Sequence, residues 1–201
     1  MTKKCILFGL ASVMAFGTYA QKNTLLVGGN VGISSSKNEN TQFETKNTAF
    51  TFDPYVGYQF DNHWTAGAVV SVGSNKQTIS SSPEEVDKTT AFAAGPFIRY
   101  THKLSDVFMV YGQLQGLFGG YKNTSSLGNV SITDKGSVFS ATLFPAVFIN
   151  LKNNFGLNFN FGGLTYGSLK PDGGKTNSSV NFNFGQVANI GISKNFSFRK
   201  K

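Results

Sequence analysis

Residues 153–163 read NNFGLNFNFGG, and this stretch decides the fold. Its odd positions are apolar: Phe155, Leu157, Phe159 and Phe161. Asn158 and Asn160 lie between them. Since successive side chains of a β-strand point to opposite faces, the stretch has one aromatic face and one amide face. The alternation predicts a strand, and the function depends on which face meets water.

The same two-residue period continues along nearly the whole chain after its N-terminal segment, and no amphipathic helix is predicted. It predicts eight strands, at 24–35, 47–60, 64–75, 89–101, 107–119, 137–151, 155–166 and 178–196. Most have the ~9–11 residues that a tilted strand needs to cross a bilayer. The fold class is therefore all-β: an eight-stranded, antiparallel, up-and-down transmembrane β-barrel.

The N-terminal segment has the pattern of a signal peptide. Lys3 and Lys4 precede the apolar run CILFGLASVMAF, which is too short to span a bilayer. Cleavage is expected between Ala20 and Gln21, which removes Cys5, the single cysteine. We therefore expect residues 1–20 to be a cleaved signal peptide and residues 21–201 to form one barrel domain.

The connections between the predicted strands alternate in length. Three are tight turns, and four are long segments rich in Ser, Asn, Thr, Gly and Lys. Bacterial outer-membrane barrels have this asymmetry, with short periplasmic turns and longer outer loops. Pro54, Pro96 and Pro145 each lie within a strand, where a residue without an N–H is expected to mark a bulge or an unpaired position.

The two faces of the strands differ in a way that indicates their surroundings. The apolar face carries no charge, as expected for side chains in lipid. The other face carries Asn, Ser, Thr, Gln and Gly, with Asp53 and Arg99 as its only charges, whereas a solvent-exposed sheet would normally carry many Lys and Glu. We therefore predict phenylalanines toward lipid and amides toward a packed lumen. The lipid-facing side chains include Phe52, Val56, Phe155, Leu157, Phe159, Phe161, Phe182 and Phe184, and an aromatic girdle is expected from Tyr58, Phe60, Trp64, Tyr100 and Phe108.

A family resemblance rests on PYVGYQF (54–60) before a short turn, a signal sequence ending AQ, and an aromatic C-terminal strand. With these features the chain resembles the eight-stranded outer-membrane β-barrels of the broad OmpA/OmpX/OmpW-like group. In particular, it looks like the small outer membrane protein beta-barrel domain proteins of Bacteroidota, over about residues 22–198. The basic end NFSFRKK departs from that pattern, since the insertion signals of the family usually end on an aromatic residue. The resemblance implies a Gram-negative outer-membrane location.

The predicted lumen offers one candidate site. Asp53 and Arg99 would form a buried ion pair within a polar plug, because buried charges need partners. Tyr55, Tyr111, Gln113 and Gln115 would assist it. The alternative is a gate or selectivity contact formed by the same residues.

The net charge is +8, of which the two signal lysines contribute two. Most of the remaining excess falls on the turns and termini, in Lys103, Lys152, Lys194, Arg199, Lys200 and Lys201. We expect this periplasmic basic rim to anchor against anionic headgroups; a solvated fringe of lysines is the alternative. No basic stripe on one face indicates nucleic acid.

Three functions remain open on the sequence alone. The first is a structural or surface-interaction barrel that displays polar extracellular loops to a partner. The second is a narrow, OmpW-like porin channel for small or apolar solutes, and the third is a soluble exported lipid-binding barrel. His63 and His102 lie in short turns, so neither an enzyme, a metal site nor a cofactor is expected. The expected partners are outer-membrane lipid and, during insertion, the barrel-assembly machinery, and the chain is expected to be a monomer.

Overall fold

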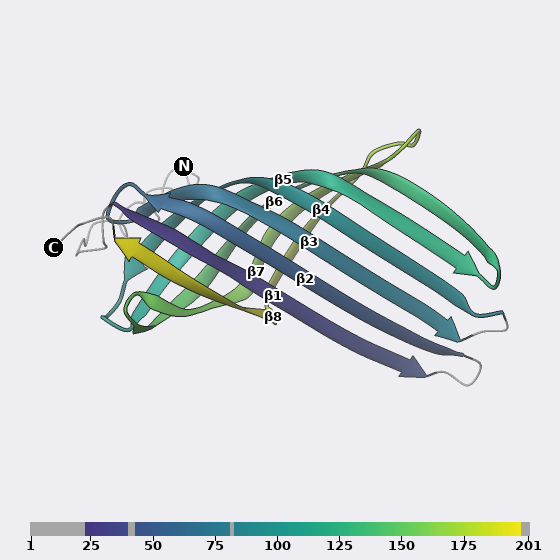
Figure 1. Ribbon diagram of the computed structural model, residues 1–201, viewed down its shortest axis with the longest axis horizontal. Coiled ribbons are helices and arrows are strands. Elements are labelled where there is room, and N and C mark those ends of the chain that lie inside the picture. Colours follow the sequence, from purple (N-terminus) through teal and green to yellow (C-terminus); the bar gives the residue numbers. More distant parts are fainter. Residues whose placement is uncertain (1–22, 40–42, 81–82, 198–201) are drawn as a thin grey trace, which may run out of the picture.

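The computed structural model describes residues 23–39, 43–80 and 83–197, and these form an antiparallel barrel of eight strands (Figure 1). The strands are β1 (Thr24–Glu39), β2 (Glu44–Gln59), β3 (Trp64–Ser80), β4 (Glu85–Lys103), β5 (Phe108–Leu127), β6 (Val130–Lys152), β7 (Phe155–Pro171) and β8 (Asn177–Ser197). Each strand pairs with the next, and β8 pairs with β1. The fold class predicted from the alternation is confirmed.

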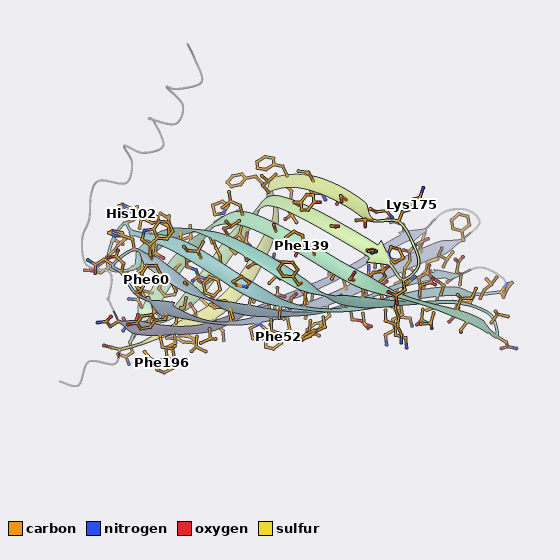
Figure 2. All side chains as sticks on the ribbon, turned by 90° about the horizontal axis from the view of Figure 1, so that it is seen from above. Phe52, Phe60, His102, Phe139, Lys175 and Phe196 are labelled. Atoms are coloured by element: carbon orange, nitrogen blue, oxygen red, sulfur yellow. The ribbon has the colours of Figure 1, made fainter. Side chains whose placement is uncertain are left out.

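The faces of the strands are also as predicted. In β2 the side chains of Tyr55 and Gln59 are buried inside the barrel, whereas those of Val56 and Tyr58 between them are exposed. Large apolar side chains cover the outside, up to Ile33 with 77 % of its surface exposed. Phe52 and Phe196 project away from the barrel wall (Figure 2). The part of the chain that the structure describes contains no helix long and apolar enough to cross a membrane.

The strands extend further than the sequence pattern predicts at one end of the barrel. At the turn end, the connections 60–63, 104–107 and 153–154 are short, as expected. At the other end, which we call the tip end, the polar segments expected as long loops mostly continue as paired strands. β5 and β6, for example, stay in register out to Leu127 and Val130. These extensions form the polar sheets that run away from the barrel in Figure 1.

The three strand prolines each interrupt pairing on one side, as predicted. Pro54 pairs with β1 while the pairing of β2 with β3 skips it, and Pro96 pairs with β3 while the pairing of β4 with β5 skips it. Pro145 pairs with β5, and the register of β6 against β7 shifts around it. A proline has no N–H to donate, so it leaves a gap toward one neighbour.

A bulge divides β7. The register against β8 shifts between Asn160 and Gly162, and Gly162 has φ +92°, a left-handed conformation that glycine adopts without strain. Before the bulge even-numbered residues such as Asn158 face the lumen, and after it Gly163 is buried while Leu164 is exposed. The single alternating run of 153–163 therefore changes face near its end.

The barrel closes over part of its length. β1 pairs with β8 only from Thr24 to Val31, opposite Ser197 to Ile190. Beyond those residues, the described remainder of β1 pairs with β2 alone and that of β8 with β7 alone. The β1–β2 and β7–β8 hairpins consequently diverge toward the tip end (Figure 1).

Candidate functional site

Aromatic and aliphatic side chains fill the lumen in two clusters. The first contains Leu26, Tyr55, Val69, Phe97 and Leu117, and the second contains Tyr111, Phe144, Ala146 and Phe148. Tyr55 meets Phe97 edge to face at 6.0 Å between ring centroids, and Tyr111 meets Phe144 in the same way at 6.5 Å. Rings in this arrangement attract one another beyond the area they bury. An eight-stranded barrel has an interior just wide enough for such a filling.

Arg99 lies among these rings with only 4 % of its surface exposed. Its Nε and Nη2 donate hydrogen bonds to Oε1 of Gln113 at 2.9 and 2.7 Å. Its guanidinium carbon lies 4.0 Å from the ring centroid of Tyr111 and 5.1 Å from that of Tyr55. The cation is therefore held by an amide oxygen and by aromatic faces, which attract it electrostatically.

The expected ion pair between Asp53 and Arg99 is not formed within the described residues, and this prediction is corrected. Asp53 instead accepts a hydrogen bond from the Ser71 hydroxyl at 2.6 Å. The register explains the separation. Arg99 pairs with Thr65 on β3, whereas Asp53 lies at the level of Ser71, six residues or about 20 Å further along that strand.

Two chains of hydrogen bonds extend from the Arg99 cluster across neighbouring strands. Gln113 donates from Nε2 to Oε1 of Gln115 at 2.9 Å, so both predicted glutamines belong to the cluster. Tyr111 donates its hydroxyl to Oδ1 of Asn158 at 3.1 Å. Asn158, 1 % exposed, donates in turn to Oγ of Ser193 at 2.8 Å.

Asn158 and Ser193 were not among the predicted site residues. Both occupy inward positions in strands whose side chains alternate between the two faces, and this was the only signal in the sequence that could have selected them. Their contacts depend on the pairing of β7 with β8, which places Gly156 opposite Ser193 and Asn158 opposite Gly191. The predicted plug therefore comprises more strands than the six named residues indicate.

Seven of the eight residues predicted to face lipid lie on the outside of the barrel. Phe52, Val56, Phe155, Phe182 and Phe184 are exposed, and Leu157 and Phe159 are half-buried on the same wall. Phe161 is half-buried next to the bulge at Gly162, where the alternation of faces changes. Its outward orientation therefore stays a prediction.

The girdle residues gather at the turn end. Tyr58, Phe60 and Phe108 are exposed on the outer wall. Trp64 packs edge to face on Tyr100 with 5.0 Å between ring centroids. His63 stacks on the same Tyr100 ring with 5.5 Å between ring centroids, and so adds to the girdle. Its Nδ1 lies 3.7 Å from Oδ1 of Asp61. In the described part of the chain, no group of three or more His, Cys, Asp or Glu residues is arranged to hold a metal ion.

The predicted basic rim separates into two environments. Lys194 lies on the outer wall, with its Nζ 5.1 Å from the ring centroid of Phe196. Lys103 instead follows Arg99 on the inward face of β4, and its Nζ contacts Oδ1 of Asp106 at 2.6 Å. This hydrogen bond lowers the pKa of the exposed Asp106 carboxyl below its usual value. Lys103 thus lies at the lumen mouth at the turn end, and its part in anchoring against headgroups stays a prediction.

The other predicted positions give no contacts of this kind. Lys152 ends β6 at the turn end, where the strand register places it opposite Phe155. Arg199, Lys200 and Lys201, and the expected cleavage site at Ala20 and Gln21, lie outside the described residues.

Comparison with known proteins gives one family and a set of solved barrels. The family model described as outer membrane protein beta-barrel domain matches residues 5–196. The translocator domain of the autotransporter NalP from Neisseria meningitidis is similar at 16 % identity and a TM-score of 0.44, with 98 % of this chain and 76 % of that chain covered. Neisserial surface protein A is similar at 12 % identity and a TM-score of 0.43, with 86 % and 97 % covered.

A third solved structure is Ail, the attachment invasion locus protein of Yersinia pestis, in complex with the heparin analogue sucrose octasulfate. It is similar at 17 % identity and a TM-score of 0.36, with 87 % of this chain and 97 % of that chain covered. A search of curated proteins found no match. The family assignment rests on the family model, which spans nearly the whole chain.

Proposed function

Because the chain belongs to the outer membrane protein beta-barrel domain family and is located in the bacterial outer membrane, we propose that it acts there as a structural and surface-interaction barrel. Its lumen is a packed plug, and the polar strand extensions at the tip end meet an extracellular partner. The short turns face the periplasm, as in outer-membrane barrels generally. This reading includes no catalytic activity and no cofactor.

The observation that carries the proposal is the filling of the lumen. Phe97, Phe144 and Phe148 are each at least 94 % buried inside the barrel, and Arg99 and Tyr111 are buried beside them. A water-filled pore would leave inward side chains exposed. The two clusters of rings at this level of the lumen therefore favour a blocked path for water and ions.

The extensions have the composition of a surface that stays in water. On β5 and β6 hydroxyl groups face each other in pairs, Thr124 with Thr133 at 3.2 Å and Ser126 with Ser131 at 2.8 Å. Lys37 near the end of β1 contacts both Glu39 and Glu44, at 2.5 and 2.9 Å, which joins β1 to β2. These contacts raise the pKa of Lys37 and lower that of Glu39.

Exposed apolar side chains are interspersed among these polar groups, which favours protein contact. Val130 and Ile132 near the tip of β6 are both exposed, and so is Leu127 across the hairpin. Apolar side chains exposed together on a polar surface are the kind of group that a protein partner would cover.

Ion conductance across a planar bilayer tests the filled lumen. The protein refolded into detergent and inserted into the bilayer should give no stable conductance steps. A variant with Phe97→Ala and Phe144→Ala, which removes one ring from each cluster, should give steps if it assembles, and so shows that insertion is detected. Stable steps from the wild-type protein would contradict the plug.

A narrow channel for small or apolar solutes is the second candidate, and the partial closure of the barrel favours it. Above Val31 and Ile190, β1 and β8 do not pair with each other in the described residues. An apolar solute could leave the barrel sideways at this seam without passing the plug. Uptake of an apolar dye into liposomes containing the protein, without ion conductance, would favour this candidate over the first.

Processing and assembly complete the proposal. We expect residues 1–20 to be removed as a signal peptide, the mature domain 21–201 to be inserted by the barrel-assembly machinery, and the barrel to work as a monomer. Mass spectrometry of the membrane-extracted protein tests the cleavage, because a start at Gln21 gives a defined mass.

A further inference from the structure

A cavity of about 220 Å³ opens at the turn end of the lumen, below the plug. This volume far exceeds the ~10–15 Å³ that one water molecule requires. Asp106, whose side chain is 95 % exposed, lies at the mouth of the cavity, so the mouth meets the solvent. Arg99 and Tyr111 lie at the inner end, where they also belong to the plug.

The charged side chains that line the cavity leave one positive charge without a counterion. Lys103 and Asp106 neutralise each other through their contact at 2.6 Å. Arg99 makes no ion pair within the described residues, and its partner Gln113 is a neutral amide. A buried charge that lacks an opposite charge is costly, so an anion entering the cavity would be attracted to Arg99.

The hydrogen bonds of Arg99 leave part of its donor capacity free. A guanidinium has five N–H groups, and here one from Nε and one from Nη2 point at the same oxygen of Gln113. The remaining three belong to Nη1 and Nη2, the pair that binds a carboxylate in a planar, two-point contact. Stacking on Tyr111 and Tyr55 holds the plane of the guanidinium, so little order is lost when a ligand binds.

The walls of the cavity select further among anions. Leu26, Met109 and Phe148 line it with apolar surface. Asn150 and Asn195 line it with amides, and the Oδ1 atoms of both are buried without a hydrogen-bond partner. As acceptors, these oxygens offer no hydrogen bond to an anion and disfavour anionic oxygens beside them. Inorganic phosphate needs donors on all sides, whereas a carboxylate with a short apolar part needs them at one end only.

We propose that this cavity is a periplasm-facing binding site for a small carboxylate anion, with Arg99 as the cationic donor. The site does not depend on the proposed surface interaction at the other end of the molecule. It also does not require a conducting pore, because the ligand enters and leaves through the turn end.

Ligand-observed NMR with acetate tests the proposal on the mature protein refolded into micelles of a neutral detergent. Acetate should show saturable binding, and Arg99→Gln should weaken it at least tenfold. The matched control is Lys122→Gln, which removes an exposed positive charge on β5 far from the cavity and should leave binding unchanged. Equal binding by the Arg99→Gln and wild-type proteins would overturn the site.

A second measurement on the wild-type protein covers the case in which Arg99→Gln does not assemble. Acetate should raise the unfolding temperature saturably, and sodium chloride at equal ionic strength should not. Phosphate should not displace acetate in the NMR experiment. Displacement by phosphate at the same concentration, or an equal temperature shift from chloride, would show only general attraction of anions and would overturn the assignment to a carboxylate.

Discussion

Asn158 connects three strands through a single side chain. Its amide accepts a hydrogen bond from Tyr111 on β5 and donates one to Ser193 on β8. Because it is almost completely buried, a replacement cannot recruit water to those partners at no cost. The Tyr111 ring in turn covers the guanidinium of Arg99, so the asparagine also fixes the position of the charge in the lumen.

Replacing Asn158 with alanine should lower the free energy of unfolding by about 1–3 kcal/mol, because it leaves two buried polar groups without their partners. Urea unfolding of the micelle-refolded protein measures this. Asn181→Ala, at an exposed position of the next strand, is the control and should change stability by less than about 0.5 kcal/mol. Equal effects of the two substitutions would mean that the hydrogen bonds of Asn158 contribute nothing.

Neighbouring strands also approach closely where the ring of Phe97 lies over two glycines. Gly57 on β2 and Gly67 on β3 are paired, and the ring of Phe97 on β4 lies over both. A Cβ at Gly67 would come within 2.6 Å of that ring and 2.1 Å of the Val56 carbonyl oxygen. The ring and the backbone therefore occupy the space that a side chain would need.

Gly67→Val should prevent assembly of the barrel, since the contact with the backbone oxygen cannot relax without moving β2. Gel mobility with and without boiling measures assembly, because a folded barrel resists the detergent until it is heated. Gly73→Val on the same face of β3 is the matched control and should assemble, since its nearest neighbour would lie at 3.8 Å. Comparable heat-dependent shifts for both variants would contradict the close packing.

At the scale of elements, the sequence predicted what depends on alternation and missed what depends on pairing. The strand order and the two faces follow from a two-residue period, which is local. The extensions do not, because runs such as SSSKNE (34–39) are polar on both faces and give no period to detect. Their strand conformation comes from hydrogen bonds to the neighbouring strand.

The lumen site shows the same limit. Both lumen charges are visible in the sequence, and so are Tyr55, Tyr111 and the two glutamines around Arg99. Whether Asp53 reaches Arg99 depends on their levels along the barrel axis, which the register of three strands sets together. The bulge at Gly162 is another feature that the sequence pattern did not predict. The residues FGG (161–163) continue the strand without indicating that the inward face changes there.

The whole molecule has an apolar belt and a polar projection. Among the side chains that the structure describes, the outward ones are apolar and uncharged between the girdle at the turn end and a second set of aromatic residues toward the tip end, Phe50, Phe92, Phe118, Phe139 and Tyr166. Phe118, Phe139 and Tyr166 lie in contact across β5, β6 and β7. The nine residues from Phe50 to Tyr58 match the ~9–11 residues that a tilted strand needs to cross the hydrocarbon core.

A lysine inside this belt should be far more costly than one beyond it. Leu114, 49 % exposed, pairs with Ile98 and Leu143 in the belt, so Leu114→Lys should destabilise the barrel in lipid vesicles by roughly 2–4 kcal/mol. Leu127, 53 % exposed at the tip of the same strand, is the control, and Leu127→Lys should be tolerated. If both lysines reduce stability in vesicles to the same degree, the belt is placed wrongly.

The projection should be separable from the barrel. The β5–β6 extension pairs from Lys122 opposite Lys135 out to its tip. Its β5 strand also pairs with the tip-end half of β4, whereas the pairing of β6 with β7 begins only at Gly136. Replacing residues 123–134 with Asn-Gly, which closes a two-residue hairpin, should leave the plug, the belt and the Asn158 hydrogen bonds intact.

This shortened protein should therefore still insert and shift on boiling, while binding of an extracellular partner by intact cells should fall. The gel shift measures assembly of the barrel and the binding assay measures contact with the partner, so one variant separates the two. Loss of the heat-dependent shift would mean that the extension is needed to fold the barrel. In that case the polar strands would serve the stability of the fold, and the surface-interaction function would lose its structural basis.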